Sequence, residues 1–461
     1  MNQGARTFAL VGLIVIILLA VHLLPTLSVG NVELRHVNVL SDVLPEVYRQ
    51  RDAIDVIPKP EPPKAILAAR SATTQEAVKQ ISPKGVTMID DYSEGEAGGM
   101  DHFYSMLAQI KTLDRPVRIA YYGDSFIEGD ILTCDIRERL QRKFGGNGVG
   151  WVDCGSEING FRRTVAQKFS GMTEYEVVKK PFNHKNEGIN QRYFVPSENA
   201  TVQTAGTQYR KLSAKWQVAR LYFRTATPFT IHTSIGGADV NTFNAGGSPA
   251  VQQAEIKQPM SNITYRFNNI GADTYLYGMS LESEQGIVLD NFSMRGSAGN
   301  TLSYIPQTTL SDFARLRPYD LIILHYGLNV VNEKSHAANY KAYVKKMKRA
   351  VDAMRKAYPE ASILVVSVPD RDQRTAGGIR TMLGVEALSA YQQIMASDCR
   401  VAYFNLFKAM GGRESMARMV DKRWANKDYT HLSFAGGAHV ANYFYRSLMA
   451  GLDNYQLRTD E

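Results

Sequence analysis

The chain of 461 residues contains a serine, a histidine and an aspartate in an order that suits nucleophilic catalysis. Ser125 ends a Gly-Asp-Ser turn directly after the apolar run Val117–Tyr122. This pattern predicts a strand that passes straight into a helix, with the serine hydroxyl at the helix N-terminus. Backbone N–H groups and the helix dipole favour developing negative charge there. We therefore expect Ser125 to attack a carbonyl group.

A base and its carboxylate partner lie near the C-terminus, where Asp428 precedes His431 by three residues. Histidine titrates closest to neutral pH, and a carboxylate fixes its tautomer and stabilises the imidazolium. The following segment, Leu432–Met449, has the apolar periodicity of an amphipathic helix, so both residues are expected on the loop before it. Taken alone, either residue is ordinary at a helix start. With Ser125 upstream, they predict a Ser-His-Asp triad.

Two loops can donate hydrogen bonds to the oxyanion of a tetrahedral intermediate. The glycine-rich loop Gly296–Thr301 follows the strand-like segment Gly286–Phe292, and a glycine lets its backbone N–H approach a substrate closely. Asn329 follows the apolar run Leu321–Leu324 in a Gly-Leu-Asn turn. Each loop follows a strand, so all of these groups are expected at one edge of a parallel sheet, where ligands bind in open α/β folds.

The rest of the chain alternates between helical and strand periodicity, which predicts a parallel sheet covered on both faces. The expected helices are 98–111, 127–144, 306–314, 336–358 and 384–396, and the expected strands are 320–325, 362–368 and 400–404.

These motifs together resemble those of the SGNH (GDSL-type) hydrolase superfamily. In the family's order they are Ser125, Gly299, Asn329 and His431, with Asp428 as the third triad member. The resemblance implies a three-layer α/β/α catalytic domain and an oxyanion hole made by Ser125, Gly299 and Asn329. Gly299 is favoured over Gly296 because the stretch 298–301 is similar to the family's Ser-Gly-Asp-Thr. Val330 stands where the family often has an acidic residue.

A narrower resemblance is to the bacterial peptidoglycan O-acetylesterase branch. Four stretches are similar: Tyr122–Ser125, Gly129–Thr133, Arg137–Leu140, and Asp91–Ser93 followed by Asp101–Phe103. This branch carries a β-rich, carbohydrate-binding-like module between its serine and glycine blocks. Roughly 170 residues separate Ser125 from Gly296, too many for one connection between neighbouring strands.

The inserted segment itself has β character. Short runs of β-branched and aromatic residues, separated by Gly, Asn, Ser and Pro clusters, predict an antiparallel β-sandwich. These runs are 216–224, 228–235, 264–268 and 274–281. The aromatic residues Tyr209, Trp216, Tyr222 and Phe223 can stack on sugar rings, or they can fill the core of the sandwich. The module can equally form a wall of the catalytic cleft.

The N-terminal segment is expected to direct export. Phe8–Leu24 is an apolar run interrupted only by Gly12 and His22 and preceded by Arg6, which favours an uncleaved signal anchor. A cleaved signal peptide is the competing interpretation. The expected organisation is an anchor helix at 1–30, a tether at 31–87, catalytic segments at 88–150 and 286–461, and the β module at 151–285. The protein is therefore expected in a bacterial cell envelope, anchored in the inner membrane and facing the periplasm, or secreted to the periplasm.

Composition adds few constraints. The net charge of +8 can attract the protein to an anionic polymer or can be ordinary solvated surface charge. Cys134 and Cys154 can pair in an oxidising compartment, although Cys134 also fits the interior of the helix after Ser125. No metal-binding spacing, cofactor motif or nucleic-acid module is recognisable. His325 lies two residues before Gly327 and can line the cleft.

The sequence thus predicts an exported serine esterase that removes O-acetyl groups from cell-envelope carbohydrate, with peptidoglycan as the substrate implied by the resemblance. The same triad can serve an O-acetyltransferase if a sugar hydroxyl replaces water. A lipase or thioesterase is a further alternative, although the polar loop 297–301 argues against an apolar groove. The alternative outside enzymes is an anchored glycan-binding protein on a degenerate hydrolase scaffold.

Overall fold

The computed structural model describes residues 8–14, 28–29, 32–33, 60–61, 80–94 and 98–459. Residues 8–14 are helical, and β1 (Ser28–Val29) pairs with β2 (Val32–Glu33). Of the expected anchor at 1–30, residues 1–7, 15–27 and 30 lie outside the described residues, as does most of the expected tether. Among the helices that are described, none is both long and apolar enough to span a bilayer.

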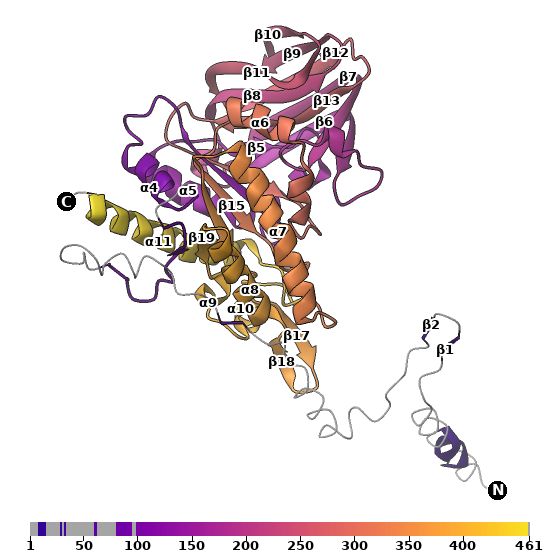
Figure 1. The fold of residues 1–461 in the computed structure, drawn as a ribbon. Coiled ribbons are helices and arrows are strands. Elements are labelled where there is room, and N and C mark those ends of the chain that lie inside the picture. Colours follow the sequence, from indigo (N-terminus) through magenta and orange to yellow (C-terminus); the bar gives the residue numbers. More distant parts are fainter. Residues whose placement is uncertain are drawn as a thin grey trace. The chain divides into compact units, whose positions relative to one another are not determined.

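A six-stranded sheet organises the catalytic region, in the order β14-β4-β15-β16-β19-β3 (Figure 1). The strands are β3 (Asp90–Asp91), β4 (Val117–Gly123), β14 (Ile287–Ser293), β15 (Leu321–His325), β16 (Ser362–Val366) and β19 (Ala402–Phe404). The five strands from β14 to β19 are parallel, as predicted. The edge strand β3 is antiparallel to β19, which the sequence analysis did not foresee. Because the five long strands are parallel, the loops that follow them share one edge.

Helices cover both faces of this sheet. α11 packs against α4 and α5, whereas α7 packs against α6 and α8 (Figure 1). Successive side chains of β4 point to opposite faces, so the Tyr121 ring lies 5.9 Å from Phe444 of α11 while the Tyr122 ring lies 4.8 Å from Phe292. The helices are α4 (Asp101–Ala108), α5 (Thr133–Phe144), α6 (Gln307–Leu316), α7 (Ala337–Ala357), α8 (Val385–Asp398), α9 (Leu406–Ala409), α10 (Ser415–Asp421) and α11 (Phe434–Thr459).

The expected helix 127–144 is wrong in its first part. After Ser125 the chain makes a turn and the short 3-10 helix η1 (Glu128–Asp130), and α5 begins only at Thr133. The reason is local, because Gly129 and Asp130 have φ of 64° and 65°. Such left-handed residues cannot continue a right-handed α-helix. Ser125 is therefore not at the N-terminus of α5, and the predicted electrostatic help from a helix dipole is absent there.

The segment between the two catalytic stretches folds into antiparallel strands. They are β5 (Gly150–Val152), β6 (Val165–Glu176), β7 (Arg192–Gly206), β8 (Trp216–Thr225), β9 (Phe229–Ile235), β10 (Ala238–Ala245), β11 (Ser248–Met260), β12 (Asn262–Asn268) and β13 (Thr274–Glu282). One group joins β11, β8, β13 and β5, and a second joins β10, β9, β12, β7 and β6. The groups meet at the pair Phe194–Leu276. A common apolar core draws on both groups, with the Phe223 ring 5.2 Å from Phe229.

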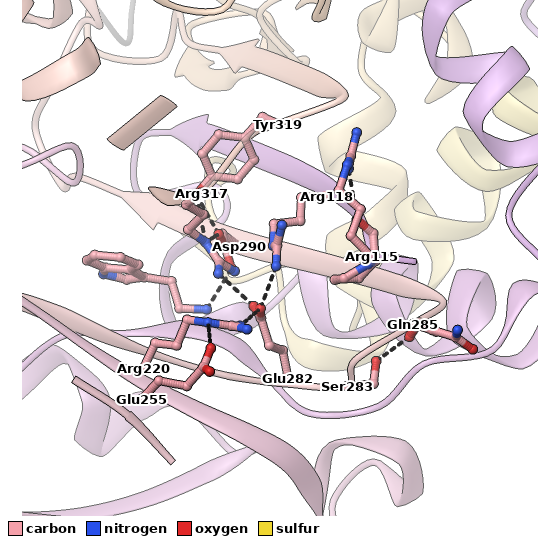
Figure 2. A network of polar contacts seen from close by, with 12 residues as sticks. Arg115, Arg118, Arg220, Glu255, Glu282, Ser283, Gln285, Asp290, Arg317 and Tyr319 are labelled. Carbon is pink, nitrogen blue, oxygen red and sulfur yellow. Dashed lines mark hydrogen bonds and ion pairs between the residues drawn. The ribbon is translucent and has the colours of Figure 1, made fainter. Parts of the chain in front are cut away.

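A buried network of charges joins these strands to the catalytic sheet (Figure 2). Glu282, the last residue of β13, accepts a hydrogen bond from Arg118 of β4 at 2.9 Å and pairs with Arg317 at 2.6 Å. Arg317 also binds both carboxylate oxygens of Asp290 on β14, at 2.6 and 2.8 Å. All four side chains are buried. Buried ions are stable only when they are paired in this way, so the network holds the β strands and the sheet in one arrangement.

Candidate active site

Ser125 lies in the turn that follows β4, at the edge where the parallel strands end. Gly123 is required at the start of this turn, because a Cβ there would come within 2.9 Å of the Ile127 side chain and 3.0 Å of the His325 carbonyl oxygen. Asp124 closes the turn by accepting a hydrogen bond from the Phe126 N–H at 3.0 Å. The turn thus presents the Ser125 side chain outward while Asp124 remains buried.

The three predicted triad side chains come together. Ser125 Oγ lies 3.0 Å from His431 Nε2, and His431 Nδ1 lies 2.7 Å from Asp428 Oδ2. With Nδ1 protonated toward Asp428, Nε2 is free to accept the serine proton. Ser125 and His431 are 306 residues apart in the sequence, so this contact is made only by the tertiary fold.

The loop before α11 holds the base in place. Asp428 Oδ1 accepts hydrogen bonds from the N–H groups of Thr430 and His431, each at 3.0 Å. The Asn426 N–H donates to the His431 carbonyl oxygen at 2.8 Å, which closes the loop. Burial of the Asp428 carboxyl acts to raise its pKa, but the hydrogen bonds from His431 and Thr430 outweigh it and lower the pKa. Asp428 is therefore an anion at neutral pH, as its role requires.

Asp124 is a second carboxyl close to this triad. Burial raises the pKa of Asp124 to about 6, against the Phe126 N–H and the charge of His431, which both lower it. Its side chain does not border the cavity that contains Ser125. Asp124 therefore stabilises the turn that carries Ser125 from the buried side of that turn.

The oxyanion donors only partly match the prediction. Asn329 borders the cavity, and one N–H of its amide donates to the Ser297 carbonyl oxygen at 2.9 Å, which leaves the second N–H to face a substrate. Gly299 does not border the cavity, and its N–H donates to Ser297 Oγ at 3.0 Å. Gly296 lines the cavity instead, and its N–H has no hydrogen-bond acceptor within the described residues.

Gly299 has a structural reason to be glycine. Its φ is 80°, and a Cβ there would come within 2.5 Å of the Tyr326 ring. A glycine needed for backbone packing and a glycine needed at a substrate look alike in the sequence. The family-like stretch 298–301 thus contains a glycine that does not border the cavity, whereas Gly296 of the same loop does, and an oxyanion role for either glycine stays a prediction.

A cavity of about 580 Å³ opens over the nucleophile. This volume suits a small ligand or one unit of a polymer. The cavity is lined by Ser125, Glu128, Gly129, Ile131, Phe161, Arg295, Gly296, Asn329, Asn426, His431, Leu432 and Phe434. The lining therefore includes ionic and amide groups as well as apolar ones. Phe161 belongs to the inserted β region, which thus forms part of the cavity wall.

A buried charge cluster that the sequence analysis missed supports the serine turn. Asp130 receives two hydrogen bonds from Arg137, at 2.9 and 3.0 Å, and one from Arg162 at 3.0 Å. Thr133 and Thr164 donate to the same carboxylate. Burial opposes ionisation of Asp130, but the two arginines outweigh it and lower its pKa. Sequence pattern gives no signal for such a cluster, because charged residues are usually exposed.

Several other candidates have structural roles instead. His325 is buried behind the cavity, its Nδ1 lies 3.1 Å from the Tyr121 hydroxyl, and burial lowers its pKa to about 3. Trp216, Tyr222 and Phe223 are buried, so they cannot stack on a sugar. The Tyr209 ring packs 5.6 Å from Phe434. The cysteines are all buried, free thiols, so no bond joins the proposed pair; they are Cys134, Cys154 and Cys399.

The fold is similar to that of a solved protein. Neither a protein-family model nor a curated protein sequence matches the chain. Among solved structures, it is similar to a peptidoglycan O-acetylesterase, with 20% sequence identity and a TM-score of 0.64 over 79% of this chain and 99% of that chain. The chain has the fold of this esterase. The resemblance predicted from the sequence is thereby confirmed for the fold.

Two other solved structures are similar at lower scores. One is a family two carbohydrate esterase from Clostridium thermocellum in complex with cellohexaose, with 10% identity and a TM-score of 0.27 over 58% of this chain and 99% of that chain. The other is a salicylyl-acyltransferase from a tetracycline biosynthetic pathway, with 12% identity and a TM-score of 0.27 over 62% of this chain and 98% of that chain.

Proposed function

We propose that the protein is a serine esterase that removes O-acetyl groups from cell-envelope carbohydrate, with peptidoglycan as the preferred substrate. The observation that carries this proposal is the chain of contacts Ser125–His431–Asp428, whose first two members border a cavity of about 580 Å³. The fold shared with a peptidoglycan O-acetylesterase supports the choice of substrate class. The apolar segment 8–24 supports an address in the cell envelope, because apolar runs of this length direct export.

The first half of the reaction transfers the acetyl group to the enzyme. His431 Nε2 takes the proton of Ser125 as Oγ attacks the acetyl carbonyl carbon. The carbonyl oxygen becomes an oxyanion, which the N–H groups of Ser125, Gly296 and the Asn329 amide are placed to receive. The carbon–oxygen bond to the sugar then breaks, and the proton on His431 moves to the departing sugar oxygen.

The second half releases acetate. A water molecule gives its proton to His431 Nε2 and attacks the acetyl carbon bound to Ser125. The same donors receive the second oxyanion. Collapse of this intermediate breaks the bond to Ser125 Oγ, which recovers its proton from His431. Asp428 keeps His431 oriented throughout and stabilises its cationic form.

The environment of the base favours hydrolysis over the alternatives. The side chains of His431 and Asp428 are 42% and 48% exposed, so water can reach the acetyl-enzyme. A transferase must exclude that water. A lipase needs an apolar groove, whereas this cavity is bordered by Glu128, Arg295 and Asn329. The preserved Ser125–His431 contact argues against a degenerate scaffold that only binds glycan.

The test is acetate release from O-acetylated peptidoglycan by the full-length protein, beside hydrolysis of 4-nitrophenyl acetate. We expect wild type to release acetate and Ser125→Ala to release none. Ser170→Ala is the matched control, because Ser170 lies on β6 and hydrogen-bonds only Thr201 among the described residues. Hydrolysis of the small ester without acetate release from the polymer would refute peptidoglycan as the substrate. If neither substrate is hydrolysed, the proposed esterase activity is refuted.

A further inference from the structure

We infer that Phe161 is the sugar-stacking surface of the active site, so that the inserted β region supplies a specificity-determining residue for the glycan. The inference rests on the proposed esterase function and deepens it. Phe161 borders the same cavity as Ser125 and His431, and its side chain is 65% exposed. Of the large apolar side chains between residues 80 and 459 that the structure describes, none is more exposed.

An isolated exposed phenylalanine needs no explanation on a plain surface. Phe161 differs because its backbone is anchored. It ends the 3-10 helix η2 (Glu157–Phe161), and the next residue, Arg162, donates to Asp130 at 3.0 Å and to the Trp151 carbonyl oxygen at 2.7 Å. Both Arg162 and Asp130 are buried. The Phe161 ring is therefore exposed to solvent, while the backbone beside it is held by buried hydrogen bonds of Arg162.

The contact with the serine segment places this ring at the cavity. Gly129 lines the cavity four residues after Ser125, and a Cβ at Gly129 would come within 3.3 Å of the Phe161 carbonyl oxygen. The two backbones are thus in direct contact. Asp130 directly follows Gly129 in the chain, and its carboxylate accepts a hydrogen bond from Arg162, which directly follows Phe161. One carboxylate therefore fixes the segment after Ser125 relative to the segment that ends at Phe161.

The Phe161 ring also has no aromatic or cationic neighbour stacked on it among the described residues. Phe434, the other phenylalanine of the cavity, has the Arg163 guanidinium 4.2 Å from its ring centre and Tyr209 at 5.6 Å. No ring or cation within the described residues contacts Phe161 in this way. A face of an aromatic ring is electron-rich and apolar, and it matches the C–H groups on one face of a pyranose.

The polar rim of the cavity suits the other groups of a sugar. Arg295 hydrogen-bonds Glu128 at 2.8 and 3.1 Å, and both residues border the cavity. These groups can exchange hydrogen bonds with hydroxyl groups, which an acyl chain lacks. An apolar platform beside an ionic rim therefore fits a glycan unit and not a lipid.

The experiment separates KM from kcat on the glycan. We expect Phe161→Ala to raise KM for soluble O-acetylated peptidoglycan fragments about 3- to 10-fold, the effect of losing one aromatic contact. It should leave kcat on the fragments unchanged. Phe161→Trp should restore KM. Phe169→Ala is the matched control, because Phe169 is 38% exposed on β6 and does not border the cavity.

A binding measurement separates this inference from the proposed function. In a Ser125→Ala background, calorimetry with the same fragments should show about 3- to 10-fold weaker binding when Phe161→Ala is added. That loss would support the inference even if wild type released no acetate. Unchanged KM and unchanged binding would overturn it while the esterase stands. A fall in kcat on the fragments with unchanged KM would also overturn it, because it indicates damage to the catalytic groups and not a lost sugar contact.

Discussion

Glu282→Gln tests whether the buried charge network joins the β strands to the catalytic sheet as described. The Glu282 carboxylate is fully buried and faces the guanidinium groups of Arg118, Arg220 and Arg317. Burial opposes its ionisation, but the three arginines hold its pKa at about 2, below the ordinary value of 4.5. A difference of this size corresponds to about 3 kcal/mol in the free energy of unfolding.

The sign follows from the direction of the shift. Because the pKa of Glu282 is lower in the folded state, its carboxylate stabilises the protein above pH 4.5, and this stabilisation is lost as the pH falls toward 2. Glutamine carries no charge at any pH and leaves the arginines short of one anion. We expect Glu282→Gln to lower the free energy of unfolding by about 3 kcal/mol at pH 7. The loss should be smaller at pH 3.

Urea unfolding followed by tryptophan fluorescence at pH 7 and pH 3 measures both values. Glu255→Gln is the matched control, because Glu255 pairs with the same Arg220 but its side chain is 31% exposed. Glu255→Gln should lower the free energy of unfolding by less than about 1 kcal/mol. The reasoning would be refuted if Glu282→Gln cost no more than the control at pH 7, or if its cost were the same at both pH values.

Two further predictions concern Asn329, a proposed oxyanion donor, and Asp372, which contacts the loop that carries His431. Asn329→Ala should lower kcat for 4-nitrophenyl acetate about 10²- to 10³-fold with KM unchanged, because its amide bonds an oxyanion that exists only in the transition state; a rise in KM with normal kcat would contradict this role. Asp370 and Asp372 are buried in the segment after β16, and the Asp372 N–H donates to the Tyr429 carbonyl oxygen at 3.1 Å, in the loop that carries His431. Burial and the charge of Asp370 raise the pKa of Asp372 to about 7, so stability contributed by its protonated form is lost as the pH rises from about 4 to 7. Asp372→Asn should therefore raise the melting temperature relative to wild type more at pH 8 than at pH 5; an equal difference at both pH values would contradict the assignment.

The local pattern was sufficient to predict that Ser125, His431 and Asp428 come together. Ser125 and Asn329 both follow apolar strands, and parallel strands bring their carboxyl ends to one edge whatever their separation in the sequence. The spacing of Asp428 and His431 allows a hydrogen bond within one short loop, which the structure contains. Such features depend on neighbours within a few residues, so they can be read from the chain.

Other features could not be predicted from local pattern. The helix expected directly after Ser125 is interrupted because Asp130 adopts a left-handed backbone held by Arg162 from a distant segment. The strands β6, β7, β10 and β11 were missed; in β6 and β10 the reason is that many residues are exposed, so the apolar alternation of a half-buried strand is absent. Trp216, for which the sequence left sugar stacking and core packing both open, is in the core, while Phe161, which no motif marks, borders the cavity.

The sequence by itself determined which residues can take part in such chemistry, their order along the chain and the type of sheet that presents them, because these follow from residue chemistry and short-range periodicity. The tertiary structure alone decided the 3.0 Å contact between Ser125 and His431, the position of Gly296 and not Gly299 at the cavity, and the exposure of Phe161. These depend on contacts between segments far apart in the chain, where burial and paired charges select one arrangement that no local pattern encodes.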